Sequence, residues 1–196
     1  MIRFVTVLGA LAFLGGCGDK NNSVDEVDEV GEGVETPAEH GDEGVEEDLD
    51  NVVNKNNWGQ TIEGAIRKNL KKPAAHVLTP KDFLSVKGKL TIRHSSISDL
   101  SKLAEVPNIT ALNLSGNKIT DLSPLAKLTK LTDLDLAGNL LIDLTPLSGL
   151  TSLKRLELAN NQIADLTPLS GLTNLTELSL DGNQIADLSP LSGLTK

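Results

Sequence analysis

The stretch LTDLDLAGNLLIDLTPLSGLTS, residues 131–152, recurs with variations through the second half of the chain at a period of 22 residues. Four consecutive units carry the pattern: 109–130, 131–152, 153–174 and 175–196. An asparagine, an aspartate and a proline keep the same place in every unit: Asn117, Asn139, Asn161 and Asn183; Asp121, Asp143, Asp165 and Asp187; Pro124, Pro146, Pro168 and Pro190. A fixed period of this length indicates that the chain winds into stacked turns, each of which contacts its neighbours.

The leucines of one unit predict a short strand followed by a turn. Leu134 and Leu136 are two residues apart, which places both side chains on the same face of an extended strand. Five further leucines complete the predicted core of the unit: Leu131, Leu141, Leu144, Leu147 and Leu150. One unit alone cannot offset the entropy that its ordering costs, so neighbouring units must share one continuous core.

The order of these residues, L-x-x-L-x-L-x-x-N-x-L, resembles the leucine-rich repeat. We expect the asparagines to stack into a ladder whose amides satisfy backbone groups at the turn. The Asp-Leu-Ser/Thr-Pro-Leu step predicts a return on the convex side, which is short enough to favour a 3-10 turn. We expect Thr145 and its equivalents to cap this turn and the proline to take its first position. The aspartates are expected to accept hydrogen bonds from local amides.

The 22-residue form with its D-[IL]-x-P-L step further resembles the internalin-type repeats of bacteria, related to the short SDS22-like class. One divergent unit, 87–108, precedes the regular ones and has Ser95 for the asparagine and Lys102 for the proline. The segment 58–86 resembles the helical N-terminal cap that stands before such repeats. Three apolar side chains mark one stripe of its first predicted helix: Ile62, Ile66 and Leu70. The resemblance implies an α/β solenoid, a horseshoe with a parallel β-sheet on its concave face, 3-10 turns on its convex face and a small helical cap.

The strand side chains between the core leucines point to the concave face, where they have no packing role and are free for recognition. Our candidate binding residues come from three columns across this face: Lys89, Asp133, Arg155 and Glu177; Asn113, Asp135 and Glu157; Arg93 and Asp181. The face is mixed in charge and has no aromatic residue, although Trp, Tyr and Arg dominate interface hot spots. We therefore expect weak or electrostatic binding, and a merely solvated face is the alternative.

The N-terminus, residues 1–16, has the features of a secretory signal peptide. Arg3 gives a positive start, and Phe4 to Leu14 is an apolar run of 11 residues, too short to span a ~30 Å hydrocarbon core. The ending Leu-Gly-Gly-Cys17 resembles the lipobox of bacterial lipoproteins, which is cut just before the cysteine. That resemblance implies that Cys17 becomes the mature N-terminus and carries acyl chains, of which two or three give stable anchoring. An ordinary signal peptide with a chance cysteine is the alternative.

Residues 17–57 contain the predicted lipidated cysteine and an acidic linker. Residues 19–50 hold 14 acidic groups and one base, whereas residues 51–196 hold 13 acidic and 16 basic groups. Low hydrophobicity with high charge predicts disorder. Calcium binding is the functional alternative, but no window has the spaced ligands, glycine and final glutamate of an EF-hand loop. By resemblance to Gram-negative sorting, the glycine directly after Cys17 favours the outer membrane if the organism has one.

Composition excludes several classes of function. The single cysteine excludes an internal disulfide and a cysteine-based zinc site or iron–sulfur cluster. A net charge of −9 with 2% aromatic residues argues against nucleic-acid binding. We find no Ser-His-Asp set, metal-ligand cluster or phosphate-binding loop, and we predict a non-enzyme without cofactor or metal.

These observations predict a lipid-anchored protein of the bacterial cell envelope that binds a protein partner through the concave face. A passive structural envelope component without a specific partner is the alternative function. The chain stops at Lys196 on a repeat boundary, and a truncated repeat array is one explanation. End-to-end self-association through the last repeat is the other, since an uncovered final repeat leaves apolar core at an open end.

Overall fold

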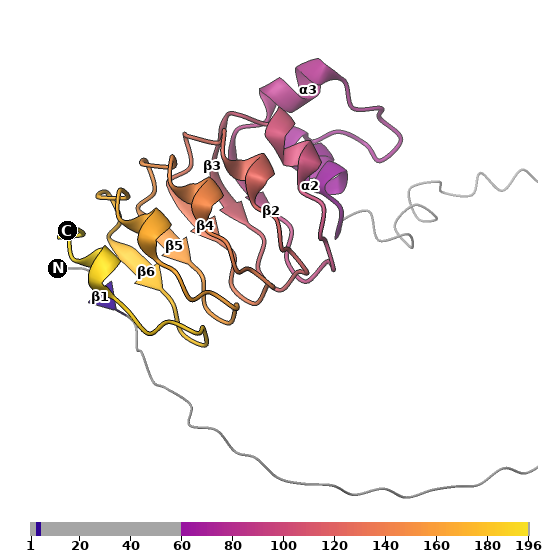
Figure 1. Cartoon of the computed structure of the whole chain (residues 1–196). Helices are drawn as coiled ribbons and strands as arrows, with labels where there is room; N and C mark the ends of the chain where they lie inside the picture. The colour runs from indigo at the N-terminus through magenta and orange to yellow at the C-terminus, as the bar shows by residue number, and fades with distance from the viewer. Residues whose placement is uncertain (1–2, 5–59, 196) are drawn as a thin grey trace, which may run out of the picture.

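The structure is a computed structural model and describes residues 3–4 and 60–195. Two α-helices, α2 (Ile62–Leu70) and α3 (Pro80–Ser85), come before the repeats. Each repeat contributes one strand: β2 (Gly88–Thr91), β3 (Ile109–Asn113), β4 (Asp133–Asp135), β5 (Arg155–Glu157) and β6 (Glu177–Ser179). Each repeat also has one 3-10 helix: η2 (Ser101–Glu105), η3 (Ser123–Leu125), η4 (Thr145–Leu147), η5 (Thr167–Leu169) and η6 (Ser189–Leu191). In Figure 1 the repeats stack side by side, with the strands on one side and the short helices on the other.

The repeat strands pair in parallel, in the order β6-β5-β4-β3-β2. Leu112 lies opposite Leu134, and Leu134 lies opposite Leu156. Each strand is therefore offset from the next by one 22-residue unit, so every leucine of the pattern stacks on its equivalent. This is the leucine-rich-repeat solenoid, with its parallel sheet on the concave side, which the sequence predicts.

The leucines of the pattern form one continuous core along the repeats. All seven predicted core leucines of residues 131–152 are at most 1% exposed. In the last repeat Leu188 is 49% exposed, whereas Leu166, in the same place one repeat earlier, is 1% exposed. The difference arises because no further repeat among the described residues packs over Leu188. A core leucine thus depends on the following repeat for its burial.

The asparagine ladder is present. The side-chain amide of Asn139 donates to the carbonyls of Leu114 (3.1 Å) and Leu136 (2.9 Å), and its oxygen accepts from the Ile119 N–H (3.1 Å). Asn161 also donates to the Leu136 carbonyl (3.0 Å), so this oxygen has two donors from consecutive repeats. The ladder connects each repeat to the next through buried backbone groups that would otherwise have no partner.

On the convex side the aspartates cap the 3-10 helices. The Asp143 carboxylate accepts from the N–H of Thr145 (2.8 Å), the first residue of η4. Our prediction that the Thr145 hydroxyl caps the turn is wrong, because the helix begins at Thr145 itself and the capping position falls on Leu144, which has no side-chain hydrogen bond. Pro146 therefore takes the second position of the turn. Hydrogen bonds from the hydroxyl and N–H of Thr145 hold the pKa of Asp143 below its ordinary value.

The N-terminal helices cover the first repeat, as predicted. Thr61 caps α2 by accepting from the Gly64 N–H (3.0 Å), and Thr79 and Asp82 form a reciprocal capping box at the start of α3. The predicted stripe of α2 faces inward: Ile62 and Ile66 are buried and Leu70 packs against the core. Phe83 of α3 is buried with them.

A further two-residue strand, β1 (Arg3–Phe4), pairs in parallel with the outer edge of β6. The sequence places these residues in the signal peptide and predicts no strand there. The rest of the predicted leader, Cys17 and the acidic linker of residues 17–57 lie outside the described residues. In residues 3–4 and 60–195 no helix has the length and apolar character needed to cross a membrane.

Candidate functional site

The candidate binding residues form registered columns across the concave sheet. Lys89, Ala111, Asp133, Arg155 and Glu177 lie opposite one another in turn along β2 to β6. The second column is Thr91, Asn113, Asp135, Glu157 and Ser179. Between them runs the column of buried leucines that includes Leu134. Because side chains alternate between the two faces of a strand, burying this leucine exposes the residues on either side of it.

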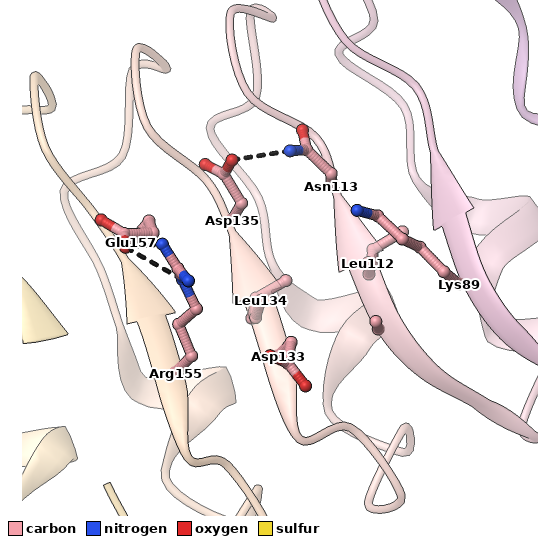
Figure 2. A pocket seen from close by; sticks show the side chains of 9 residues that line it. Lys89, Leu112, Asn113, Asp133, Leu134, Asp135, Arg155 and Glu157 are labelled. Carbon is pink, nitrogen blue, oxygen red and sulfur yellow. Dashed lines mark hydrogen bonds and ion pairs between the residues drawn. The ribbon is translucent and has the colours of Figure 1, made fainter. Parts of the chain in front are cut away.

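A hollow of about 420 Å³ lies over the first four of these strands. Its walls are mainly charged or polar, and Ala111 and two strand leucines complete it: Lys89, Ala111, Leu112, Asn113, Asp133, Leu134, Asp135, Arg155 and Glu157. Figure 2 shows Lys89 on one side of the hollow, Asp133 and Asp135 from β4 in the middle, and Arg155 and Glu157 from β5 on the other side. The hollow therefore presents charges of both signs, carried by β2, β4 and β5, across four repeats.

Arg155 is held by two carboxylates. Its guanidinium lies 3.1 Å from Glu157 on the same strand and 3.2 Å from Glu177 on the next strand. The Arg155 side chain is 53% exposed, so these ion pairs add little to stability but fix the direction of the side chain. Its positive charge is largely offset before any partner arrives.

Asn113 and Asp135 form a second fixed pair, drawn as a dashed line in Figure 2. The Asn113 amide donates to the Asp135 carboxylate (2.7 Å), whose other oxygen accepts from the Ala137 N–H (3.1 Å). The Asn113 oxygen in turn accepts from the N–H of Ser115 (3.1 Å). Both side chains are half-buried and are held in place by neighbouring groups.

Lys89 and Asp133 differ from these paired groups. Both are exposed. The Lys89 ammonium makes no hydrogen bond or ion pair within the described part of the chain, and Asp133 accepts only from the hydroxyl of its neighbour Thr132 (2.6 Å). Among the exposed charges that line the hollow, these two have no ion-pair partner in the described chain.

Three candidates lie outside the hollow. Glu177 contacts it through Arg155, whereas Arg93 and Asp181 follow the ends of their strands. Three residues that line the hollow, Ala111, Leu112 and Leu134, are absent from the sequence-based selection. Ala111 belongs to the column that begins at Lys89, and this position in the repeat could have identified it from the sequence as a residue of the concave face. The two leucines were assigned to the core alone.

The hollow offers charged and polar groups that can bind a partner. Among residues 3–4 and 60–195 no group of three or more His, Cys, Asp or Glu side chains is arranged to hold a metal ion. The hollow combines one free ammonium, one free carboxylate and two fixed polar pairs above apolar atoms. Such an arrangement suits recognition of a polar surface that carries charges of both signs.

Comparisons with known proteins agree with this fold. A family model described as Leucine Rich repeats (2 copies) matches residues 107–149 and 151–193. No curated protein matches the chain significantly. The solved internalin inlF from Listeria monocytogenes is 30% identical with a TM-score of 0.57, and the match covers 67% of this chain and 45% of that one.

The functional domain of InlJ from the same organism is 24% identical with a TM-score of 0.54, over 71% of this chain and 36% of that one. This second likeness supports the fold alone. The chain thus spans less than half of either solved protein. The repeat model and the inlF match support an internalin-like leucine-rich-repeat fold.

Proposed function

We propose that this internalin-like leucine-rich-repeat protein is held at the bacterial cell envelope by a lipid and binds a protein partner through its concave face. Leucine-rich repeats are protein-binding modules, and solenoids generally use their extended concave surfaces for recognition. The observation that carries the proposal is the hollow on β2 to β5, where Lys89 and Asp133 are charged, exposed and without an opposite charge.

The fixed pairs around the hollow favour binding. Arg155 is held between Glu157 and Glu177, and Asp135 is held by Asn113, so these side chains lose little conformational freedom when a partner docks. Lys89 and Asp133 would then supply the electrostatic recognition. Affinity should be modest and should fall with salt, since the face lacks aromatic anchors and its charges are exposed.

The test is capture of envelope proteins by the full chain. The triple variant Lys89→Gln, Asp133→Asn, Arg155→Gln removes exposed charges of the first column and leaves every core leucine in place. Its control is Lys127→Gln, which removes an exposed charge just beyond η3 on the convex side. We expect a partner that is retained by the wild type and the control and lost by the triple variant. Equal recovery with all three proteins would reject the concave face as the binding site.

The same comparison separates binding from the alternative of a passive envelope component. A passive component retains no protein specifically in any of the three forms. We infer binding rather than catalysis because the described concave groups are fixed polar pairs and single exposed charges, which suit recognition of a charged surface.

Lipid anchoring rests on the lipobox-like ending at Cys17. We propose that Cys17 is acylated after removal of residues 1–16 and that the acidic linker holds the repeats away from the membrane. In cells grown on a radiolabelled fatty acid, the wild-type protein should be labelled and Cys17→Ala should not. Persistent labelling of the variant would contradict the anchor.

The location follows from the same proposal. The glycine after Cys17 favours the outer membrane in a Gram-negative cell. Protease added to intact cells should cleave the linker if the repeats face outward. Cleavage only after the outer membrane is opened would place the protein on the periplasmic side.

A further inference from the structure

Two large aliphatic side chains of the repeat 131–152 face solvent on the flank of the solenoid. Leu140 is 43% exposed and Ile142 is 64% exposed, whereas Leu141 between them is fully buried. The chain here leaves the asparagine ladder and runs toward η4, so this flank lies between the concave sheet and the convex side. Ile142 and Leu140 therefore contribute little to the core.

The other repeats show that the fold does not require these two residues. Their equivalents are small or polar in every other repeat: Ser96 and Ser98, Lys118 and Thr120, Gln162 and Ala164, Gln184 and Ala186. Leu188, which is also exposed, occupies a core column and is uncovered only at the end of the described stack. The aliphatic pair is thus a departure from the repeat pattern in one place.

A small apolar surface results, which we name the flank patch: Leu140, Ile142 and Ala164. The N–H of Gln162 donates to the carbonyl of Leu141 (2.9 Å), so equivalent residues of these two repeats lie side by side. Ala164 is exposed and continues the column of Ile142. Exposed apolar surface with a polar rim is typical of sites that contact another protein.

A row of carboxylates borders the flank patch. Asp143 follows Ile142 in the chain, and its equivalents extend the row along the solenoid: Asp121, Asp165 and Asp187. The charges of Asp121 and Asp165 raise the pKa of Asp143, but the hydrogen bonds from Thr145 lower it by more. Within the described chain none of the four forms an ion pair with a basic side chain.

We propose that the flank patch is a second docking surface, which takes a short amphipathic segment of a partner protein with apolar side chains next to Lys or Arg. The apolar side chains cover Leu140 and Ile142, and the basic side chains lie against the aspartate row. This charge complementarity selects the occupant, since an acidic segment or an anionic lipid surface would meet repulsion along the row. The surface is separate from the concave hollow, so it can act whether or not the hollow binds a partner.

The repeats supply the variants for the test. Leu140→Gln with Ile142→Ala gives this repeat the residues that its two C-terminal neighbours already carry, without touching the core. Lys118→Gln with Thr120→Ala makes the same conversion one repeat earlier and serves as the matched control. A peptide library displayed on phage is selected on the immobilised full chain and counter-selected on the flank-patch variant. The best peptide is then synthesised and its affinity is measured for each form at low and at raised salt.

We expect the selected peptides to combine apolar residues with Lys or Arg. The best one should bind the flank-patch variant at least tenfold more weakly than the wild type and weaken as salt rises. It should bind the control variant at least as well as the wild type, because the control only removes a cation from the repeat that carries Asp121. Selected peptides without basic residues, or none that discriminates between the two chains, would overturn the proposal. Sedimentation of the chain without peptide tests another occupant: a dimer of the wild type that the flank-patch variant lacks would assign the surface to a second copy of the chain.

Discussion

Sharing of carbonyls along the asparagine ladder predicts energetic coupling between neighbouring repeats. The Leu136 carbonyl accepts from both Asn139 (2.9 Å) and Asn161 (3.0 Å). Either asparagine alone keeps this oxygen paired, and only the loss of both leaves it buried without a donor. Asn139→Ala and Asn161→Ala should therefore cost more together than the sum of their separate costs.

The magnitude follows from the hydrogen bonds that each change removes. Asn139→Ala leaves the buried N–H of Ile119 without its acceptor, which costs about 1–3 kcal/mol of unfolding free energy. It also removes one of the two donors to each of the carbonyls of Leu114 and Leu136, which costs about 0.5 kcal/mol for each carbonyl. Each single variant should thus lose about 2–4 kcal/mol of unfolding free energy. The double variant also leaves the Leu136 carbonyl without a donor, which adds a coupling of about 0.5–2.5 kcal/mol.

The assay is a double-mutant cycle from urea unfolding followed by far-ultraviolet circular dichroism, with trimethylamine oxide added if the double variant is unfolded in water. The matched control is the pair Asn117→Ala and Asn161→Ala. Asn117 donates to the carbonyls of Ile92 and Leu114, so it shares none with Asn161 and the two costs should add within about 0.5 kcal/mol. Additive costs for the neighbouring pair, or equal coupling in both pairs, would refute the reasoning.

Three further outcomes follow from the described geometry. Hydrogen bonds in the folded state lower the pKa of Asp143, so this carboxylate contributes its full stabilisation above its unfolded pKa of about 3.9. The stabilisation is lost as the pH falls through the lower pKa of the folded state. In an acid titration the unfolding free energy of Asp143→Asn should therefore fall less steeply than that of the wild type. Gly138 has a φ of +65°, so Gly138→Ala should lower the unfolding free energy in urea by about 1–2 kcal/mol. A Cβ at Gly149 would lie in open space, so Gly149→Ala should leave the unfolding free energy equal or raise it by up to about 1 kcal/mol. Leu134 is 1% exposed, and Leu134→Ala should cost about 2–5 kcal/mol of unfolding free energy in the same assay.

Much of the candidate site could be predicted from the sequence because the repeat length fixes the register. Once one strand residue faces inward, the residue 22 positions later must do the same, and the columns that begin at Lys89 and Thr91 follow directly. The same regularity predicted the asparagine ladder, whereas the helical spacing of Ile62, Ile66 and Leu70 predicted the inward stripe of α2. The direction of each exposed side chain could not be predicted in this way. Arg155 reaches Glu177 on the next strand, and a period says nothing of which rotamer a long surface side chain adopts.

The capping of the convex turns shows a second limit. The sequence favoured Thr145 as the cap, but the turn begins at Thr145 itself, one residue earlier than that role would require, and Asp143 accepts the hydrogen bond instead. A shift of one residue in the start of a short helix is decided by how the backbone packs over the core, and the local sequence carries little information about it.

By itself the sequence determined that this chain forms a leucine-rich solenoid and which residues face inward, because periodic apolar side chains can be buried only by stacking equivalent residues. Tertiary structure alone decided how the surface groups combine: which charges pair, which remain free around the hollow, which carbonyls two asparagines share, and that Leu140 and Ile142 stay in solvent. The physical reason is that burial depends on a spacing repeated along the chain, whereas each surface contact depends on the distance between individual atoms brought together from different repeats.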